Sequence, residues 1–406
     1  MKMSPDRLLM NNYGTPPVKF ISGKGTLLLD EHGKEYLDFL SGLAVTSLGH
    51  SHPKIAEALA NQAQTLLHVS NLFDTDPHLE VAKYLDELIR KETGIKTPGR
   101  VIFQNSGAEA NEAAIKLARK YQGPGRHVVL SALRSFHGRT LATLAATGQP
   151  EKHQQFQPLP EGFRHAIWND LESFSSLVDS SVGAILLEPV QGEGGVNPAD
   201  PGFLKGIRDL CDENNVLLIM DEIQAGLGRT GKWFGFQHAG IDPDIVTCAK
   251  ALGNGVPIGA VWATEDVAST FNPGDHGSTF GGQPLAASAA REVLRTMIEI
   301  DAPLLAKSRG EELTKLLNET AGIESVRGKG LLLAAELNSE ILKEHTGPEI
   351  ARACLEAGLV VNGVTPTSLR LAPPLTVSSE ELIRGAALLG EVLASAIGEE
   401  KNETHS

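Results

Sequence analysis

The sequence predicts an α/β protein in which helices cover a mostly parallel sheet and a smaller α+β domain lies beside it. From about residue 50, apolar runs typical of buried strands alternate with stretches of helical periodicity. This alternation ends after Gly281 and Gly282, and a long stretch rich in Ala and Leu begins near Pro284. The chain has 406 residues, enough for one large and one smaller domain. In such folds, ligands bind beyond the carboxyl ends of the parallel strands.

Each predicted element follows from a local pattern. Short apolar runs flank the turn signal DEHGK within residues 18–38, which favours β structure there. Helical spacing of apolar positions predicts helices at 52–67 and 108–121. Short apolar runs predict strands of the main sheet at 101–103, 128–130, 183–187, 216–220, 244–248 and 260–263. Beyond the boundary near residue 285 we expect a long helical stretch, strands around 330–337, 359–361 and 369–371, and a final helix.

Composition excludes several classes of function. The net charge of −14 argues against a nucleic-acid partner, because phosphate binding needs clustered Lys and Arg. Three widely spaced cysteines outside any CxxC pattern argue against a disulfide framework or a zinc site and for a reducing compartment. We expect no metal at His50 and His52, which fit a loop leading into a helix. No segment has the apolar length of a membrane helix, so a cytoplasmic location is expected.

An acid and a lysine stand at the ends of two predicted strands. The apolar run 216–220 is followed by Asp221, and the run 244–248 is followed two residues later by Lys250. Such a pair can hold the two ends of a pyridoxal phosphate ring, with the lysine as Schiff base to the aldehyde and the acid at the ring nitrogen. An Asp and a Lys at strand ends are also common in proteins without a cofactor, so the pair alone does not decide between these roles.

The surroundings of this pair resemble a known family. Residues 220–231, with the sequence MDEIQAGLGRTG, resemble the signature of class III aminotransferases, and residues 249–253 and 257–260 fit the same family. The resemblance covers nearly the whole chain. It implies the pyridoxal phosphate-dependent transferase fold type I, in which the N-terminal segment joins the C-terminal part. We therefore expect a large cofactor-binding domain at 50–284 and a small domain made of 1–49 and 285–406.

A helix start after the strand at 101–103 is a candidate phosphate site. Small residues at a helix start let backbone N–H groups approach an anion, which the helix dipole favours. Ser106, Gly107 and Ala108 occupy this position. The same residues also fit an ordinary helix cap, with Ser106 as the cap and Glu109 as its partner. The family resemblance places the phosphate here.

Other family motifs imply contacts with the cofactor ring and the substrate. The resemblance assigns Phe136 to stacking on the ring, Gln224 to the ring hydroxyl, and Arg139 to the α-carboxylate of the substrate. Arginine suits this last task because its planar fork matches a carboxylate. In residues 276–282, the resemblance implies that Thr279 reaches the phosphate of a partner subunit, with Ser278 near the substrate. It thus implies a homodimer with shared sites, although such a loop also fits a plain turn.

Glu193 and Arg370 form the basis of a hypothesis for dual specificity. Glu193 is flanked by glycines and can swing, and in related ω-aminotransferases it pairs with the arginine at the position of Arg370. Paired, the two leave room for an amine-bearing chain. Unpaired, Arg370 can bind the distal carboxylate of glutamate or 2-oxoglutarate.

Four further segments are similar to those of the acetylornithine type, namely 12–17, 68–73, 136–140 and 191–193. The implied reaction moves the δ-amino group of N-acetylornithine to 2-oxoglutarate, with ping-pong kinetics through Lys250. Relatives that act on ornithine, succinylornithine, succinyldiaminopimelate or 4-aminobutyrate are alternatives, as is a racemase or decarboxylase of the same fold. Ala251 and Asn254 stand where many relatives have glycine, which leaves the shape of the loop after Lys250 open.

Overall fold

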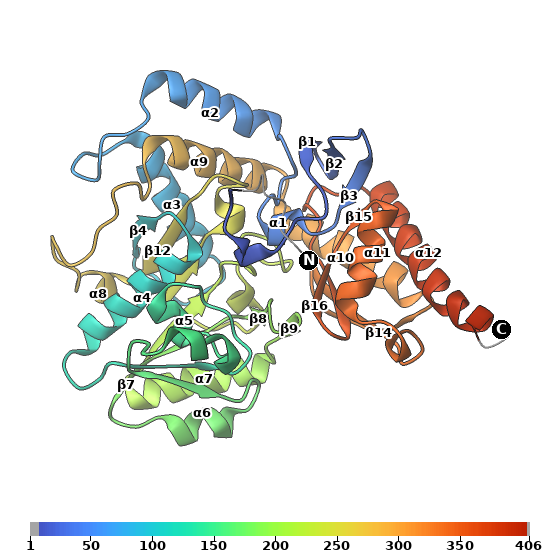
Figure 1. Cartoon of the computed structure of the whole chain (residues 1–406). Coiled ribbons are helices and arrows are strands. Elements are labelled where there is room, and N and C mark those ends of the chain that lie inside the picture. The colour runs from blue at the N-terminus through green and yellow to red at the C-terminus, as the bar shows by residue number, and fades with distance from the viewer. Residues whose placement is uncertain (1–7, 404–406) are drawn as a thin grey trace.

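The computed structural model describes residues 8–403, and its largest sheet has seven strands in the order β4-β12-β11-β10-β7-β5-β6 (Figure 1). Strands β10, β11, β7, β5 and β6 run parallel, and β12 is antiparallel to both of its neighbours. The strands are β4 (Arg100–Gln104), β5 (Val128–Ala132), β6 (Phe163–Ala166), β7 (Val182–Leu187), β10 (Leu217–Asp221), β11 (Ile245–Cys248) and β12 (Gly259–Ala263). The mostly parallel sheet is confirmed, and of its strands only β6 was not predicted.

Helices cover both faces of this sheet because its strands are apolar on both sides. In β10, Leu217 and Ile219 pack into one cluster and Leu218 and Met220 into another, as the alternation of side chains along a strand requires. The first cluster lies under α4 (Gly107–Gln122), whose buried alanines let it approach closely. The other face is covered by α3 (Asp76–Arg90), α7 (Pro201–Asn214) and α9 (Pro284–Glu299), and α2 (Pro53–Thr65) packs on the outside of α9 (Figure 1).

The C-terminal part forms a four-stranded antiparallel sheet in the order β13-β14-β17-β16. The strands β13 (Ile323–Lys329), β14 (Leu332–Leu337), β16 (Asn362–Thr365) and β17 (Ser368–Leu371) are accompanied by α10 (Ala302–Asn318), α11 (Gly347–Ala357) and α12 (Ser379–Glu403). The strands β13 and β16 were not predicted, because polar residues and glycine dominate both. No helix within residues 8–403 is both long and apolar enough to cross a bilayer.

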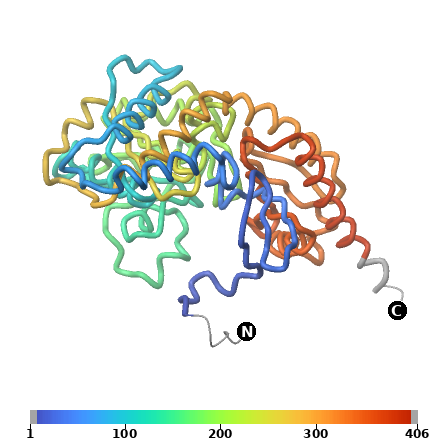
Figure 2. The backbone as a smooth tube through the Cα atoms, turned by 90° about the horizontal axis from the view of Figure 1, so that it is seen from above, coloured from blue at the N-terminus to red at the C-terminus, as the bar shows by residue number. Residues whose placement is uncertain are grey.

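The N-terminal strands lie beside this C-terminal part although they are far from it in sequence (Figure 2). The strands β1 (Phe20–Lys24), β2 (Leu27–Asp30) and β3 (Glu35–Asp38) form an antiparallel meander, and β15 (Leu359–Val360) adds to β3 in parallel. The exact division into domains at 50–284 and 1–49 with 285–406 stays a prediction, and residues 1–7 and 404–406 lie outside the described part.

Candidate active site

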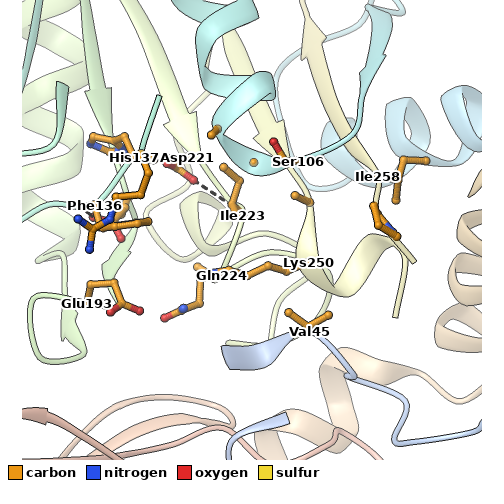
Figure 3. A pocket seen from close by; sticks show the side chains of 18 of the residues that line it. Val45, Ser106, Phe136, His137, Glu193, Asp221, Ile223, Gln224, Lys250 and Ile258 are labelled. Carbon is orange, nitrogen blue, oxygen red and sulfur yellow. Dashed lines mark hydrogen bonds and ion pairs between the residues drawn. The ribbon is translucent and has the colours of Figure 1, made fainter. Parts of the chain in front are cut away.

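A cavity of about 380 Å³ opens at the carboxyl ends of the parallel strands (Figure 3). The loops that leave β4, β5, β7, β10 and β11 all contribute to its walls. Nine of the predicted site residues line it, namely Ser106, Gly107, Ala108, Phe136, Arg139, Glu193, Asp221, Gln224 and Lys250. Arg370 lies directly behind this wall, bonded to two of these residues.

Asp221 is fixed at the end of β10 by three hydrogen bonds. One carboxylate oxygen accepts from Asn111 at 2.8 Å and is 2.8 Å from Nδ1 of His137, while the other accepts from the Ile223 N–H at 3.1 Å. Asn111 is itself oriented by Thr247, whose hydroxyl donates to the Asn111 side-chain oxygen at 2.8 Å. The carboxylate is therefore buried and held in place, as a fixed partner of a ring nitrogen must be.

Lys250 extends into the cavity from a strained backbone position just after β11. Its φ of 43° lies in the left-handed region, which costs a non-glycine residue of order 1–2 kcal/mol and is common at functional sites. Burial and, after it, the nearby Arg370 lower the pKa of the Lys250 amine. A lowered pKa favours the neutral amine, the form needed by a nucleophile and proton acceptor.

The start of α4 combines a helix cap with an open surface toward the cavity. The Ser106 hydroxyl accepts from the Glu109 N–H at 3.2 Å, and Glu109 accepts from the Asn105 N–H at 2.7 Å. The cap that the sequence left as an alternative is thus present. A Cβ at Gly107 would lie 2.8 Å from the Ile223 side chain, so a larger residue here would push Ile223 out of its place in the cavity wall. The first helical turn still offers backbone N–H groups to an anion.

Phe136 and Ile223 provide apolar walls for the cavity. The Arg139 guanidinium lies 5.5 Å from the centre of the Phe136 ring, and no described carboxylate pairs with it. The cavity thus contains a flat apolar surface beside a cation that is available to a ligand.

Glu193 and Arg370 form an ion pair of 2.6 Å at the rim of the cavity. Arg370 also donates to Gln224 at 3.3 Å and to Asn362 at 3.0 Å. Its side chain is only 1 % exposed, whereas that of Glu193 is 30 % exposed. The pairing that the sequence hypothesis requires is present, while the roles assigned to the two residues stay predictions.

Ser278 and Thr279 do not line the cavity of their own chain. The Ser278 hydroxyl accepts from the Asn105 side chain at 2.9 Å. Asn105 lines the cavity, so Ser278 lies behind Asn105, on the side away from the cavity. Thr279 is exposed on the same loop. Their predicted reach into a partner's site stays a prediction.

Asn254 adopts a positive φ in the loop after Lys250, at a position where many relatives have glycine. Its φ of 46° is one that glycine adopts without strain and asparagine tolerates. Its side chain accepts from the Leu48 N–H at 2.7 Å and donates to the Gly49 carbonyl at 3.1 Å. Asparagine therefore preserves the turn and ties it to the segment that brings Val45 to the cavity. That segment begins with a left-handed turn at Ser41–Ala44.

Sequence reasoning gave no role to Asn111, His137, Ile223 and Glu188. Asn111 lies near the start of a helix and Glu188 follows a predicted strand, and neither position by itself indicates a function. The structure links Asn111 to the site through its hydrogen bond to Asp221, and Glu188 through its place in the cavity wall. Burial raises the pKa of the Glu188 carboxyl to about 7, and its oxygens accept from the Phe136 and Gly192 N–H groups at 3.1 and 3.3 Å.

Comparisons with known proteins identify relatives over nearly the whole chain. The profile of the family described as "Aminotransferase class-III" matches residues 9–393. The acetylornithine aminotransferase of Corynebacterium efficiens is 46 % identical over 96 % of this chain and 95 % of its own length. That of Methanocaldococcus jannaschii is 47 % identical over 91 % and 92 %.

Solved structures extend the similarity to three dimensions. The ornithine aminotransferase of Toxoplasma gondii ME49 has a TM-score of 0.89 at 33 % identity and covers 97 % of this chain and 94 % of its own. The N-acetylornithine aminotransferase of Stenotrophomonas maltophilia K279a has a TM-score of 0.81 at 35 % identity over 96 % and 99 %. The fold is fold type I of the pyridoxal phosphate enzymes, and this chain belongs to the class III aminotransferases.

Proposed function

We propose that this enzyme transfers the δ-amino group of N-acetylornithine to 2-oxoglutarate, giving N-acetylglutamate 5-semialdehyde and glutamate in arginine biosynthesis. The proposal rests on a cavity in which Lys250 is accompanied by two arginines. Arg139 has no described carboxylate partner, and Arg370 is paired with the partly exposed Glu193. Such a site accepts a substrate with one carboxylate and, after the acid moves, a substrate with two. The names of the similar proteins support the same substrate.

The residues of the cavity fit pyridoxal phosphate. We assign the ring nitrogen to Asp221, the phosphate to the N–H groups at residues 106–108, one ring face to Phe136, and the ring hydroxyl to Gln224. When bound, the cofactor supplies an electron sink for the charge that develops at the substrate carbon. Lys250 would take the proton from that carbon and return it at the cofactor side, as general base and then general acid.

We also propose which carboxylate each arginine binds. Arg370 donates to Gln224, which lines the cavity together with Lys250, so a carboxylate held by Arg370 would lie on the same side of the cavity as the reactive lysine. In glutamate and 2-oxoglutarate this is the α-carboxylate, and the distal one would then reach Arg139. For these two substrates this reverses the sequence hypothesis, which placed the α-carboxylate on Arg139 and the distal carboxylate on Arg370.

A homodimer and a cytoplasmic location stay proposals. Exposed apolar side chains surround the loop of Ser278 and Thr279, where Leu72 is 84 %, Phe73 67 % and Phe280 66 % exposed. The Asn71 side chain donates to the Ser278 carbonyl at 2.8 Å, so the two loops form one surface. An apolar surface of this kind supports burial against a second copy.

A spectral titration without acceptor tests the substrate. N-acetylornithine at low concentration is expected to bleach the absorbance of the bound cofactor, and 2-oxoglutarate is expected to restore it. Ornithine, succinylornithine, succinyldiaminopimelate and 4-aminobutyrate serve as comparison donors. If one of these bleaches the band while N-acetylornithine does not, the named donor is wrong and the transaminase assignment stands.

Ornithine is the second candidate donor, because a protein named ornithine aminotransferase matches the fold with a TM-score of 0.89. A racemase or decarboxylase is disfavoured by the second arginine, since neither reaction needs a dicarboxylate acceptor. Turnover of an amino acid without any 2-oxo acid would support one of these instead.

A further inference from the structure

The negative charge of Glu193 loses its ion-pair partner if the side chain moves away from Arg370. Breaking a buried ion pair by removing one partner is strongly destabilising, because a charge is left uncompensated. A substrate carboxylate would replace Glu193 as the partner of Arg370, and the Glu193 carboxylate, which is only 30 % exposed, would then be stabilised by another cation. This question rests on the proposed exchange at Arg370 and concerns the same site.

Glu193 has room to move away from the cavity. It lies in the wall between the candidate active site and a second cavity of about 870 Å³, which borders the segments 148–151 and 167–169. Glycines precede and follow it, and Gly195 has a φ of 114° that other residues rarely adopt. Because Glu193 already lines both cavities, its side chain can turn toward the second one by rotation about its own bonds.

Few cations are available to receive it. Burial acts to raise the pKa of the Glu193 carboxyl, but Arg370, Lys250 and Lys152 together hold it below its ordinary value. Lys250 must be neutral when it accepts a proton, and Arg370 would hold the substrate. Arg139 would bind the other carboxylate of the acceptor. Arg134 also lines the second cavity but is exposed to water, whereas Lys152 is half-buried and already lowers the pKa of the Glu193 carboxyl.

Lys152 is placed beside the cavity without a carboxylate of its own. It ends the short helix η2 (Pro150–Lys152) and is half-buried, with its ammonium 5.6 Å from the centre of the Phe136 ring. The ammonium donates to the Gln149 side chain, and no carboxylate of the described chain lies within ion-pair distance of it. Burial and the neighbouring Arg139 lower the pKa of Lys152, and Glu193 acts in the opposite direction. Phe136 and Glu193 lie on the same side of the cavity (Figure 3).

We propose that Lys152 is a positioning residue that receives the Glu193 carboxylate whenever a substrate carboxylate occupies Arg370. The acid then alternates between two cations, so that its negative charge is compensated in both half-reactions. Lys152 acts on the dicarboxylate substrate through Glu193 and does not contact it.

Binding of glutarate to the cofactor-loaded enzyme tests this inference. Glutarate carries the two carboxylates of the acceptor but no amino or oxo group, so calorimetry measures binding without reaction. We expect Lys152→Met, which keeps the apolar stem against Phe136, to weaken glutarate about 10-fold. Lys152→Arg, which keeps the charge, should stay within about 2-fold of the wild type. In Lys152→Met, the rate of the glutamate half-reaction should also fall about 10-fold. The rate of the N-acetylornithine half-reaction should change less than about 2-fold.

The same measurement in a Glu193→Gln background separates a role through Glu193 from direct binding. There is no charge to receive in that background, so Lys152→Met should have no further effect on glutarate. If the loss of about 10-fold persists there, Lys152 binds the ligand itself, and the inference is wrong. An unchanged affinity in the Lys152→Met single variant would also overturn it. If Lys152→Met folds poorly, Lys152→Gln replaces it. Because the glutarate and glutamate measurements contain no N-acetylornithine, their outcome does not depend on whether N-acetylornithine is the natural donor.

Discussion

The two ends of the candidate site differ in how firmly they are held. At the inner end, Asp221 is 3 % exposed and bonded to two side chains that are also buried. At the rim, the ion pair of Glu193 and Arg370 joins a buried guanidinium to an acid that is 30 % exposed and flanked by glycines. The comparison indicates that one charge serves as a constant partner of the cofactor and the other as an exchangeable partner of the substrate.

The inner end should give the largest effect on catalysis. Asp221→Ala is expected to lower the rates of both half-reactions by about 10²- to 10³-fold, the size seen when a preorganised electrostatic partner is lost. Asp221→Asn keeps most of the side-chain volume but not the charge, so it should lose nearly as much. Stopped-flow absorbance of the bound cofactor measures each half-reaction separately. A loss confined to one half-reaction would remove the distinction between the two ends.

The rim should give a large but one-sided effect. Arg370→Ala is expected to slow the glutamate half-reaction by about 10²-fold and the N-acetylornithine half-reaction by less than about 10-fold, because only the first needs the freed guanidinium. Glu193→Gln provides the matched control, since it leaves Arg370 available and should spare the glutamate half-reaction. Equal losses in both half-reactions of Arg370→Ala would contradict the exchange.

Asn254 should give the smallest effect, and mainly on stability. Asn254→Ala loses two hydrogen bonds and puts a strained φ on alanine, so the free energy of unfolding should fall by about 2–3 kcal/mol. Asn254→Gly also loses the hydrogen bonds but relieves the backbone, and should be the more stable of the two by about 1 kcal/mol. Urea unfolding followed by circular dichroism measures both. An Ala variant as stable as the Gly variant would show that the backbone conformation costs nothing there.

The sequence predicts the main sheet well because its central strands are short and mainly apolar. It predicts the positions of Asp221 and Lys250 because each follows such a run closely. The polar strand β13 escapes the same reasoning because its residues are partly exposed and its apolar pattern is interrupted. Asn111 and His137 also escape, because they lie 110 and 84 positions from their partner Asp221, and these contacts follow only from the packing of α4 and the loop after β5 on the sheet.

The pairing of β3 with β15 has a consequence for the way the chain folds. β15 ends at Val360 of a chain of 406 residues. During synthesis, β3 therefore cannot pair with its parallel neighbour until most of the chain has been made. The segment that follows β3 carries Val45 to the cavity. Because contacts of such large sequence separation form slowly, the wall at Val45 should be among the last parts to be completed. A nascent chain that ends between residues 250 and 359 would contain Asp221 and Lys250 but lack a finished pocket around them.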